Sequence, residues 1–213
     1  MTKKFAQKKR PSKKKRSSPF KIVLIPIIVI AVYYAVNNEE TTYNLSSLGK
    51  EEVPSEYIPI YKAAEEEYGV PWYLLAAHHR VETKFSTMKT LVSPVGAEGH
   101  MQFMPCTFVG WSHPSCSGLG KGNIPQSQKT DPEVIEKYGG YGVDANGDGI
   151  ADPFQIEDAV FSAANYLERN GAADGKIEQA VFAYNHSDKY VEDVLYYADR
   201  FVEDEEEESG EAM

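Results

Sequence analysis

Apolar residues recur at the spacing of an α-helix along the second half of the chain. One segment follows Asp152-Pro153, and its apolar positions are Ile156, Ala159, Val160, Ala163 and Leu167. Two later segments repeat the pattern, with Ile177, Ala180, Val181 and Tyr184, and then with Val191, Val194, Leu195 and Ala198. Positions three or four apart share one face of a helix. No segment alternates apolar and polar residues over more than a few positions, so the pattern predicts an all-α domain with long loops between about Thr87 and Ile150.

Capping residues and prolines mark where these helices begin. Ser55 is a suitable N-cap, and Pro71 and Pro132 fit the first turn of a helix, where the missing N–H is not needed. Glycines after the apolar segments are typical of helix ends. The expected helices are 55–68, 71–85, one from Asp131-Pro132 to Gly139 and one from Asp152-Pro153 to Gly171.

The N-terminus has the pattern of a membrane signal. Residues 1–21 carry basic side chains and no acidic one, residues 22–36 are uncharged and apolar, and Glu39 and Glu40 follow. Basic residues stay on the cytoplasmic side of a membrane, so we expect the rest of the chain outside the cytoplasm. We interpret 1–21 as a basic cytoplasmic segment and 22–36 as a single-pass transmembrane signal anchor. The alternatives are a signal peptide that is cleaved, because the run is short for a span, and a buried soluble helix.

Composition divides the remaining chain further. Residues 37–54 are polar and read as a linker, 55–202 as the folded domain, and 203–213 as an acidic, disordered tail. The net charge of the 213 residues is −10, but ten of the 22 basic residues lie within 1–21, which leaves 12 basic against 32 acidic residues. Residues 22–213 are therefore strongly acidic and would repel phosphates, which excludes a general nucleic-acid binder.

Glu82 lies on the apolar side of the helix expected over 71–85. At about 100° per residue, its side chain falls between His78 and Leu75, inside the apolar arc. Loss of solvent disfavours the ionised carboxylate and raises its pKa, which a general acid near neutral pH requires. The alternative is an edge Glu that reaches water or pairs with a neighbour: Arg80, His79 or Lys84.

The residues after this helix carry a resemblance to a known family. Segment 93–105 reads S-P-V-G-A-E-G-H-M-Q-F-M-P, and it follows Val81-Glu82-Thr83 and precedes Ala183-Tyr184-Asn185. Together these blocks resemble the lytic murein transglycosylases, which share a fold with goose-type lysozymes. The D-A-N-G-D-G sequence from Asp144, followed by Asp158-Ala and by A-N-Y-L at 164–167, is similar to the membrane-bound lytic transglycosylase B branch. The resemblance covers about residues 70–201 and implies a lysozyme-like helical domain.

The resemblance also implies roles for individual residues. Glu82 matches the single catalytic acid and base of the family. The positions expected in the sugar cleft are Ser93, Gly96, Gln102, Tyr184 and Asn185, with Gly96 opening the cleft floor and Tyr184 facing the acid. His100 departs from the family, which has Leu there, and we interpret Glu98 as a loop residue at a variable position.

The function expected from this match is cleavage of peptidoglycan glycan strands between N-acetylmuramic acid and N-acetylglucosamine. One carboxylate then serves as acid and base, and the 6-hydroxyl of the sugar closes a 1,6-anhydro product. The alternatives are hydrolysis by water in the same site, and a catalytically silent module that binds peptidoglycan or calcium. We expect a membrane-anchored monomer that needs no cofactor for catalysis.

Residues 144–152 resemble the first part of a calcium-binding EF-hand loop. The candidate ligands are the oxygens of Asp144, Asn146, Asp148, Ile150 (its carbonyl) and Asp152. The twelfth position, normally a bidentate Glu, is Gln155, so a Ca²⁺ ion held here would be weakly bound and structural. The alternative is an Asx-rich turn before the next helix.

Two cysteines exclude a multi-bridge disulfide scaffold and a four-cysteine zinc site. Cys106 and Cys116 lie in one loop, outside the membrane by the topology argument, so we expect a disulfide. A buried thiol pair, or a metal site that uses His100 or His113, is the alternative. Trp72 and Trp111 are expected in the core or in the cleft wall.

Overall fold

The computed structural model describes residues 52–211. These residues form helices joined by loops and contain no β-strand beyond the isolated bridges of Glu98 with Val92 and Phe103. The prediction of an all-α domain is therefore confirmed for this part of the chain. The segments 1–21 and 22–36 and most of the 37–54 linker lie outside the described residues. No helix within 52–211 combines the length and the apolar character needed to cross a membrane.

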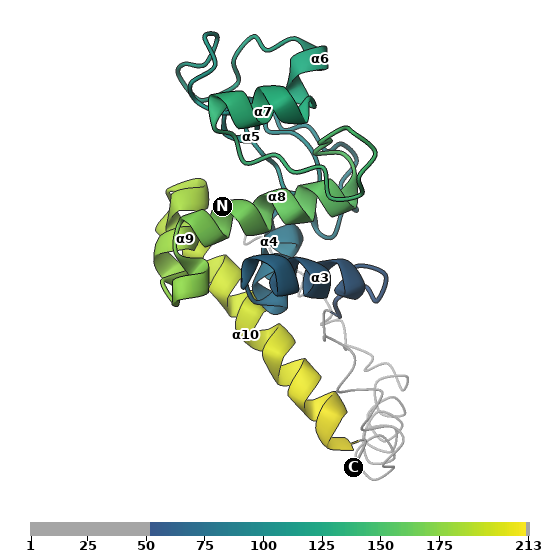
Figure 1. The fold of residues 1–213 in the computed structure, drawn as a ribbon. Helices are drawn as coiled ribbons and strands as arrows, with labels where there is room; N and C mark the ends of the chain where they lie inside the picture. Colours follow the sequence, from purple (N-terminus) through teal and green to yellow (C-terminus); the bar gives the residue numbers. More distant parts are fainter. Residues whose placement is uncertain (1–51, 212–213) are drawn as a thin grey trace, which may run out of the picture. The chain divides into compact units, whose positions relative to one another are not determined.

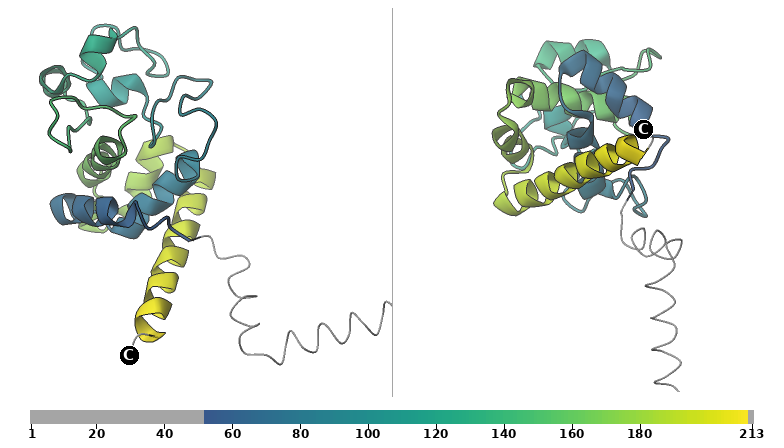
Figure 2. Two further views of the ribbon diagram at one scale, coloured as in Figure 1. Left: turned by 90° about the vertical axis from the view of Figure 1, so that its right-hand side faces the viewer. Right: turned by 90° about the horizontal axis from the view of Figure 1, so that it is seen from below.

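The helices fall into two parts of the fold (Figure 1). The longer helices gather in one part, which contains α3 (Ile58–Tyr68), α4 (Trp72–Thr83), α8 (Ile156–Arg169), α9 (Ile177–Asn185) and α10 (Asp188–Glu211), with the 3-10 turn η1 (Ala172–Asp174). The other part consists of long loops around three short helices, α5 (Pro105–Val109), α6 (Gln126–Lys129) and α7 (Pro132–Tyr138). Figure 2 shows the same division from the side, with α5–α7 at the end opposite to the C-terminal end of α10.

The helical part is held together by apolar side chains. α10 packs along α4, and α3 packs against both α4 and α8. Leu74, Leu75, Leu167 and Val194 have no exposed surface. Burying such a side chain contributes about 1.5–3 kcal/mol each. Most of the periodic positions that predicted helices are thus buried in the core or packed against it.

Four helix boundaries differ from those predicted. α3 begins at Ile58 with Tyr57, not Ser55, at its N-cap, and α4 ends at Thr83, two residues before the predicted Phe85. α8 begins at Ile156 and not at Asp152-Pro153, because the Asp152 side chain accepts from the N–H of Phe154 in a tight turn. α10 continues through residues 203–211, where the acidic tail was expected to be disordered. Glu is a good helix former, and Glu205 gains two partners across the fold: Lys62 at 2.9 Å and the indole N–H of Trp72 at 3.1 Å.

The loop part is held by covalent and polar contacts. Cys106 and Cys116 form the predicted disulfide. Gly99 has a φ of +82°, and a Cβ there would lie 1.9 Å from the carbonyl oxygen of Pro153, so only glycine fits. His100 donates its backbone N–H to the Pro153 carbonyl at the same place. The 93–105 loop and the 144–155 loop therefore meet backbone to backbone.

A chain of hydrogen bonds ties these loops to α4. His79, fully buried on α4, contacts the Tyr61 hydroxyl with Nδ1 and the Ser86 hydroxyl with Nε2, both at 2.6 Å. Ser86 also contacts His100 Nδ1, and His100 Nε2 lies 2.8 Å from the carbonyl oxygen of Phe154. The histidine that departs from the family pattern is therefore a structural link between the two parts.

α8 carries a stripe of buried polar side chains toward the loops. Asp158, Ser162 and Asn165 lie on one helical face, and each bonds the main chain of segment 141–152. Asp158 accepts N–H groups from Ala145, Asn146 and Asp152. These side chains satisfy backbone groups that no strand or helix pairs. We call Asp158, Ser162 and Asn165 the α8 polar stripe.

Candidate active site

A cleft of about 770 Å³ lies where the helical part meets the loops. Its walls come from the end of α4, the loop 93–104, the loop after α5, α8 and the end of α9. The side chains that line it include Glu82, Ser93, Gln102, Tyr184 and Asn185. Residues that are distant in the sequence, and that the resemblance grouped as one site, therefore face one cavity. Gly96 lies between the lining residues Val95 and Ala97.

Glu82 is the one carboxyl group among the residues that line this cleft. Burial raises its pKa from 4.5 to about 7, against the opposing effect of a hydrogen bond from Tyr190. The Tyr190 hydroxyl donates to Glu82 Oε1 at 2.6 Å. A carboxyl group with this pKa is partly protonated at neutral pH and can both give and take a proton.

Tyr184 lies beside this acid without bonding it. Its hydroxyl donates to the carbonyl oxygen of Met101 at 2.9 Å, and its ring is parallel to that of Tyr190, with the centroids 6.4 Å apart. The negative charge of Glu82 adds to burial in raising the pKa of the Tyr184 phenol. Tyr184 thus lies within electrostatic reach of Glu82 and fixes the loop that carries Met101, while its role toward the acid stays a prediction.

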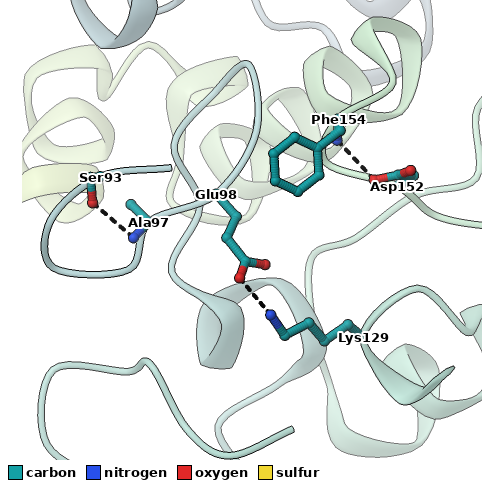
Figure 3. A network of polar contacts seen from close by, with 6 residues as sticks. All are labelled: Ser93, Ala97, Glu98, Lys129, Asp152 and Phe154. Atoms are coloured by element: carbon teal, nitrogen blue, oxygen red, sulfur yellow. Dashed lines mark hydrogen bonds and ion pairs between the residues drawn. The ribbon is translucent and has the colours of Figure 1, made fainter. Parts of the chain in front are cut away.

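Ser93 and Gln102 shape the loop wall through bonds within it. The Ser93 hydroxyl accepts from the N–H of Ala97 at 2.9 Å, a contact drawn in Figure 3. Gln102 has a φ of +52° and donates its side-chain amide to the carbonyl oxygens of Leu91 and Gly99. Gly96 has a φ of +97°, and a Cβ there would press on the side chain of Lys121. The loop conformation is therefore set by its own polar residues.

Glu98 points away from this wall. Figure 3 shows its carboxylate directed to Lys129, with which it forms an ion pair whose side chains are each 20% exposed. The cleft does not include Glu98 among its lining residues. This agrees with the interpretation of Glu98 as a loop residue, and it leaves Glu82 alone as the acid facing the cavity.

The rest of the cleft is mainly apolar and aromatic. Trp111 is 53% exposed and Leu119 78% exposed, and both line the cavity together with the rings of Tyr141 and Tyr166. Trp72, in contrast, is buried in the core. Cavities of this volume with apolar walls and a few polar groups are typical of ligand-binding sites. Exposed aromatic rings offer flat faces against which the apolar face of a sugar can pack.

Sequence reasoning missed Tyr190 and the part played by His78. His78 is fully buried, and its Nδ1 lies 2.9 Å from the Tyr190 hydroxyl. One signal was present: Tyr190, Val194 and Ala198 are four apart, which places a hydroxyl on the buried face of α10. A hydroxyl on one apolar face and a carboxyl on another are candidates for pairing, since buried polar groups need partners.

The loop 144–152 has the Asx-turn arrangement. Asp144 accepts N–H groups from Gly147, Asp148 and Gly149, and the oxygens of Asn146 and Asp148 accept others from the same loop. The Gln155 amide donates to Asp148 and accepts from Asn146, and so closes the loop. Within residues 52–205, no group of three or more His, Cys, Asp or Glu side chains is placed to hold a metal ion. The carboxylates of this loop alone are therefore not grouped around a common point, and the Ca²⁺ site stays a prediction.

Comparison with known proteins gives one family match. The model of the transglycosylase SLT domain matches residues 135–181, from within α7 to within α9. The matched segment contains the α8 polar stripe, whereas Glu82 and the 93–105 loop precede it. The search of curated proteins finds no match. The match supports a lytic transglycosylase family for this chain, the family that the segments 81–83, 93–105 and 183–185 resemble.

Proposed function

We propose that the chain is a peptidoglycan lytic transglycosylase with Glu82 as its acid and base. The observation that carries the proposal is a lone carboxyl group, with a pKa raised to about 7, in an aromatic cleft of about 770 Å³. The match to the transglycosylase SLT domain supports the same activity. The substrate is a glycan strand bound along the cleft, with its rings against Trp111 and Tyr141.

The single carboxyl group in the cleft favours a mechanism in which one residue is both acid and base over the two-carboxylate mechanisms of most glycosidases. Glycosidases that retain or invert the anomeric centre generally use two carboxylates, about 5–9.5 Å apart. Glu98, the acidic residue of the 93–105 loop, is paired with Lys129 and does not line the cleft. A reaction in which one group acts twice, first as acid and then as base, needs no second carboxylate.

The steps balance without water. Protonated Glu82 donates its proton to the glycosidic oxygen between N-acetylmuramic acid and N-acetylglucosamine, and the bond to the anomeric carbon breaks. The acetamido group of the substrate supports the positive charge that develops there. Ionised Glu82 then takes the proton from the 6-hydroxyl, whose oxygen bonds the anomeric carbon. The product ends in a 1,6-anhydro ring, and Glu82 is protonated again.

Hydrolysis is the second candidate, because water in place of the 6-hydroxyl meets the same acid and base. Mass spectrometry of products from purified peptidoglycan separates the two, since the anhydro product lacks one water. Glu82→Gln should lower turnover at least about 100-fold, the lower end of what a general acid and base contributes. A turnover within tenfold of the unchanged protein would exclude Glu82.

The pH profile gives an independent check. The first step needs protonated Glu82, so kcat/KM should fall as the pH rises above about 7. The stability of the fold should fall over a similar pH range. Since the folded-state pKa lies above the ordinary 4.5, ionised Glu82 destabilises the fold increasingly from pH 4.5 to 7 and fully above it. Glu82→Gln should therefore unfold at the same or a higher temperature than the unchanged protein at pH 8, which separates lost chemistry from lost folding.

The basic and apolar N-terminal segments suggest where the enzyme acts. We propose that residues 22–36 anchor it in the membrane, with the cleft on the extracytoplasmic side, where peptidoglycan lies. The Cys106–Cys116 disulfide supports this location, because disulfides persist in oxidising compartments. Protease treatment of intact spheroplasts should remove the domain while the membrane stays closed. Protection of the domain would contradict the topology.

A further inference from the structure

His78 is the buried group next to the acid that the mechanism above does not use. It lies on α4 one turn before Glu82 and has no exposed surface. Its Nδ1 is 2.9 Å from the Tyr190 hydroxyl, which is itself 2.6 Å from Glu82 Oε1. Its Nε2 is buried without a hydrogen-bond partner among the described residues. Three groups from α4 and α10 therefore form a chain that ends at one oxygen of the acid.

Counting protons assigns a direction to this chain. A tyrosine hydroxyl has one proton to donate, and Tyr190 donates it to Glu82 Oε1. The contact with His78 must then be one that Tyr190 accepts, so the proton of the neutral imidazole is on Nδ1. Burial keeps His78 neutral by lowering its pKa to about 3.

The unpartnered nitrogen supports the same tautomer. If the proton were on Nε2, a buried N–H would have no acceptor. Orphaned buried N–H groups are rarer in proteins than acceptors that lack a partner. With the proton on Nδ1, the unpaired atom is a bare ring nitrogen, and every proton of the chain has an acceptor.

This direction matters because the two oxygens of Glu82 are not equivalent. Oε1 accepts from Tyr190, whereas Oε2 has no hydrogen bond to any residue in the described part of the chain. If Tyr190 donates to Oε1 at all times, the acidic proton cannot lie between Oε1 and Tyr190. It must lie on Oε2. If Tyr190 could instead donate its proton to His78, its oxygen would be free to accept from protonated Glu82. The acidic proton would then lie on Oε1 and point to Tyr190, where the substrate cannot take it.

We propose that His78 is a positioning residue, whose Nδ1–H makes Tyr190 a permanent donor to Glu82 Oε1 and reserves the transferable proton for Oε2. The proposal rests on the proposed function for its catalytic meaning, but not for the tautomer itself. The groups in contact with His78 are Tyr184 from α9 and Tyr190 from α10, and Glu82 follows one turn later on its own helix. Among these, Glu82 is the group that titrates near neutral pH.

The tautomer can be measured without substrate. In protein labelled with ¹⁵N-histidine, the ring nitrogens of His78 should show a protonated Nδ1 and a bare Nε2 from pH 5 to pH 8. The signal lost in His78→Phe, or in His78→Asn if the Phe variant does not fold, identifies His78 among the five histidines of the chain. A protonated Nε2 with a bare Nδ1 would overturn the proposal.

Two variants test the positioning. His78→Phe fills the space without a nitrogen, whereas His78→Asn keeps a donor near Nδ1. His78→Phe should lower kcat about tenfold, the equivalent of one hydrogen bond, and leave KM within about twofold. A weaker bond to ionised Glu82 also raises its pKa, so the alkaline limb of the profile should move to higher pH. His78→Asn should recover most of kcat and the original limb.

A matched control is His79→Asn, which changes the adjacent buried histidine of α4. His79 bonds Tyr61 and Ser86 and not the chain to Glu82. This variant should lower the unfolding temperature and leave the pH profile in place. An unchanged kcat in His78→Phe, or an equal loss in both His78 variants, would contradict the proposal. If purified peptidoglycan is not cleaved while His78 shows protonated Nδ1, the proposed function fails and the tautomer assignment stands.

Discussion

The helical part and the loop part of this domain are stabilised by different kinds of contact. In the first, α4 and α10 bury Leu74, Leu75 and Val194 completely. In the second, segment 84–155 has three short helices, and its fixed points are a disulfide, glycines at positive φ and side chains that bond the main chain. Apolar packing places Glu82 and lowers its exposure to water. Polar bonding places the loop opposite, whose shape decides what fits the cleft.

The difference shows how one cleft combines two requirements. An acid with a raised pKa needs a rigid, apolar surrounding, which helices provide. A wall that fits an extended polymer needs an irregular course, for which loops are suited. The tests below separate the two kinds of contact, beginning with the largest expected effect.

Removing a core side chain should lower the free energy of unfolding more than the other changes. Leu167, on α8, has no exposed surface, so Leu167→Ala should lower the free energy of unfolding by about 2–5 kcal/mol. Leu119→Ala is the control, because Leu119 is 78% exposed and its loss should change stability by less than about 0.5 kcal/mol. Urea unfolding measures both. Similar losses at the two positions would break the distinction between a packed and an open part.

Removing the disulfide should have the second-largest effect on the free energy of unfolding. The Cys106–Cys116 bridge closes a short loop, and restriction of the unfolded chain by such a loop corresponds to about 2.5 kcal/mol. Cys106→Ala with Cys116→Ala should lose this amount by urea unfolding. A reducing agent should affect the unchanged protein and leave the double variant as it is. If the double variant is as stable as the parent, the loop part does not depend on its bridge.

A change in the α8 polar stripe should have the third-largest effect on the free energy of unfolding. Asp158→Asn keeps the side-chain volume but replaces a carboxylate oxygen with an amide N–H₂. That group would face the N–H of Asp152, which the Asp158 carboxylate accepts in the unchanged protein. An unsatisfied buried group costs about 1–3 kcal/mol, so a loss near 2 kcal/mol is expected. Asp174→Asn, at an exposed position of η1, is the control. Faster amide hydrogen exchange at Ala145 and Asp152, with little change in α4, would locate the loss in the loops.

Calcium should have the smallest effect. If Asp144, Asn146 and Asp148 hold Ca²⁺ with a dissociation constant near 1 mM, then 10 mM Ca²⁺ adds about 1.4 kcal/mol. Thermal unfolding should shift upward by a few degrees, and Asp148→Ala should abolish the shift. A melting temperature independent of Ca²⁺ up to 10 mM would mean that Gln155 and the backbone N–H groups hold the loop by themselves.

The two parts also differ in how far the sequence predicted them. The periodic apolar positions located α8, α9 and α10, whereas caps, prolines and glycines indicated α3, α4 and α7. The helical arc placed Glu82 toward the core. The short helices α5 and α6 were missed, because a helix of one turn depends on contacts with distant segments more than on its own sequence. The bond from Tyr190 to Glu82 joins α10 to α4, a pairing that no local period contains. The cleft positions Ser93, Gln102 and Asn185 came from the resemblance, since loops carry little periodic signal.

The α8 polar stripe has a practical consequence for exchanging parts of the enzyme. Asp158, Ser162 and Asn165 recognise peptide groups of residues 141–152, and peptide groups are the same in every sequence. These three attachments therefore do not depend on the side chains of that segment, whereas Gly142 and the buried Ala151 still restrict its course. A segment of equal length and backbone course, taken from another protein or designed for a new ligand, would find the same three anchors. α8 thus anchors this segment through main-chain groups, which a replacement segment with the same backbone course would also present.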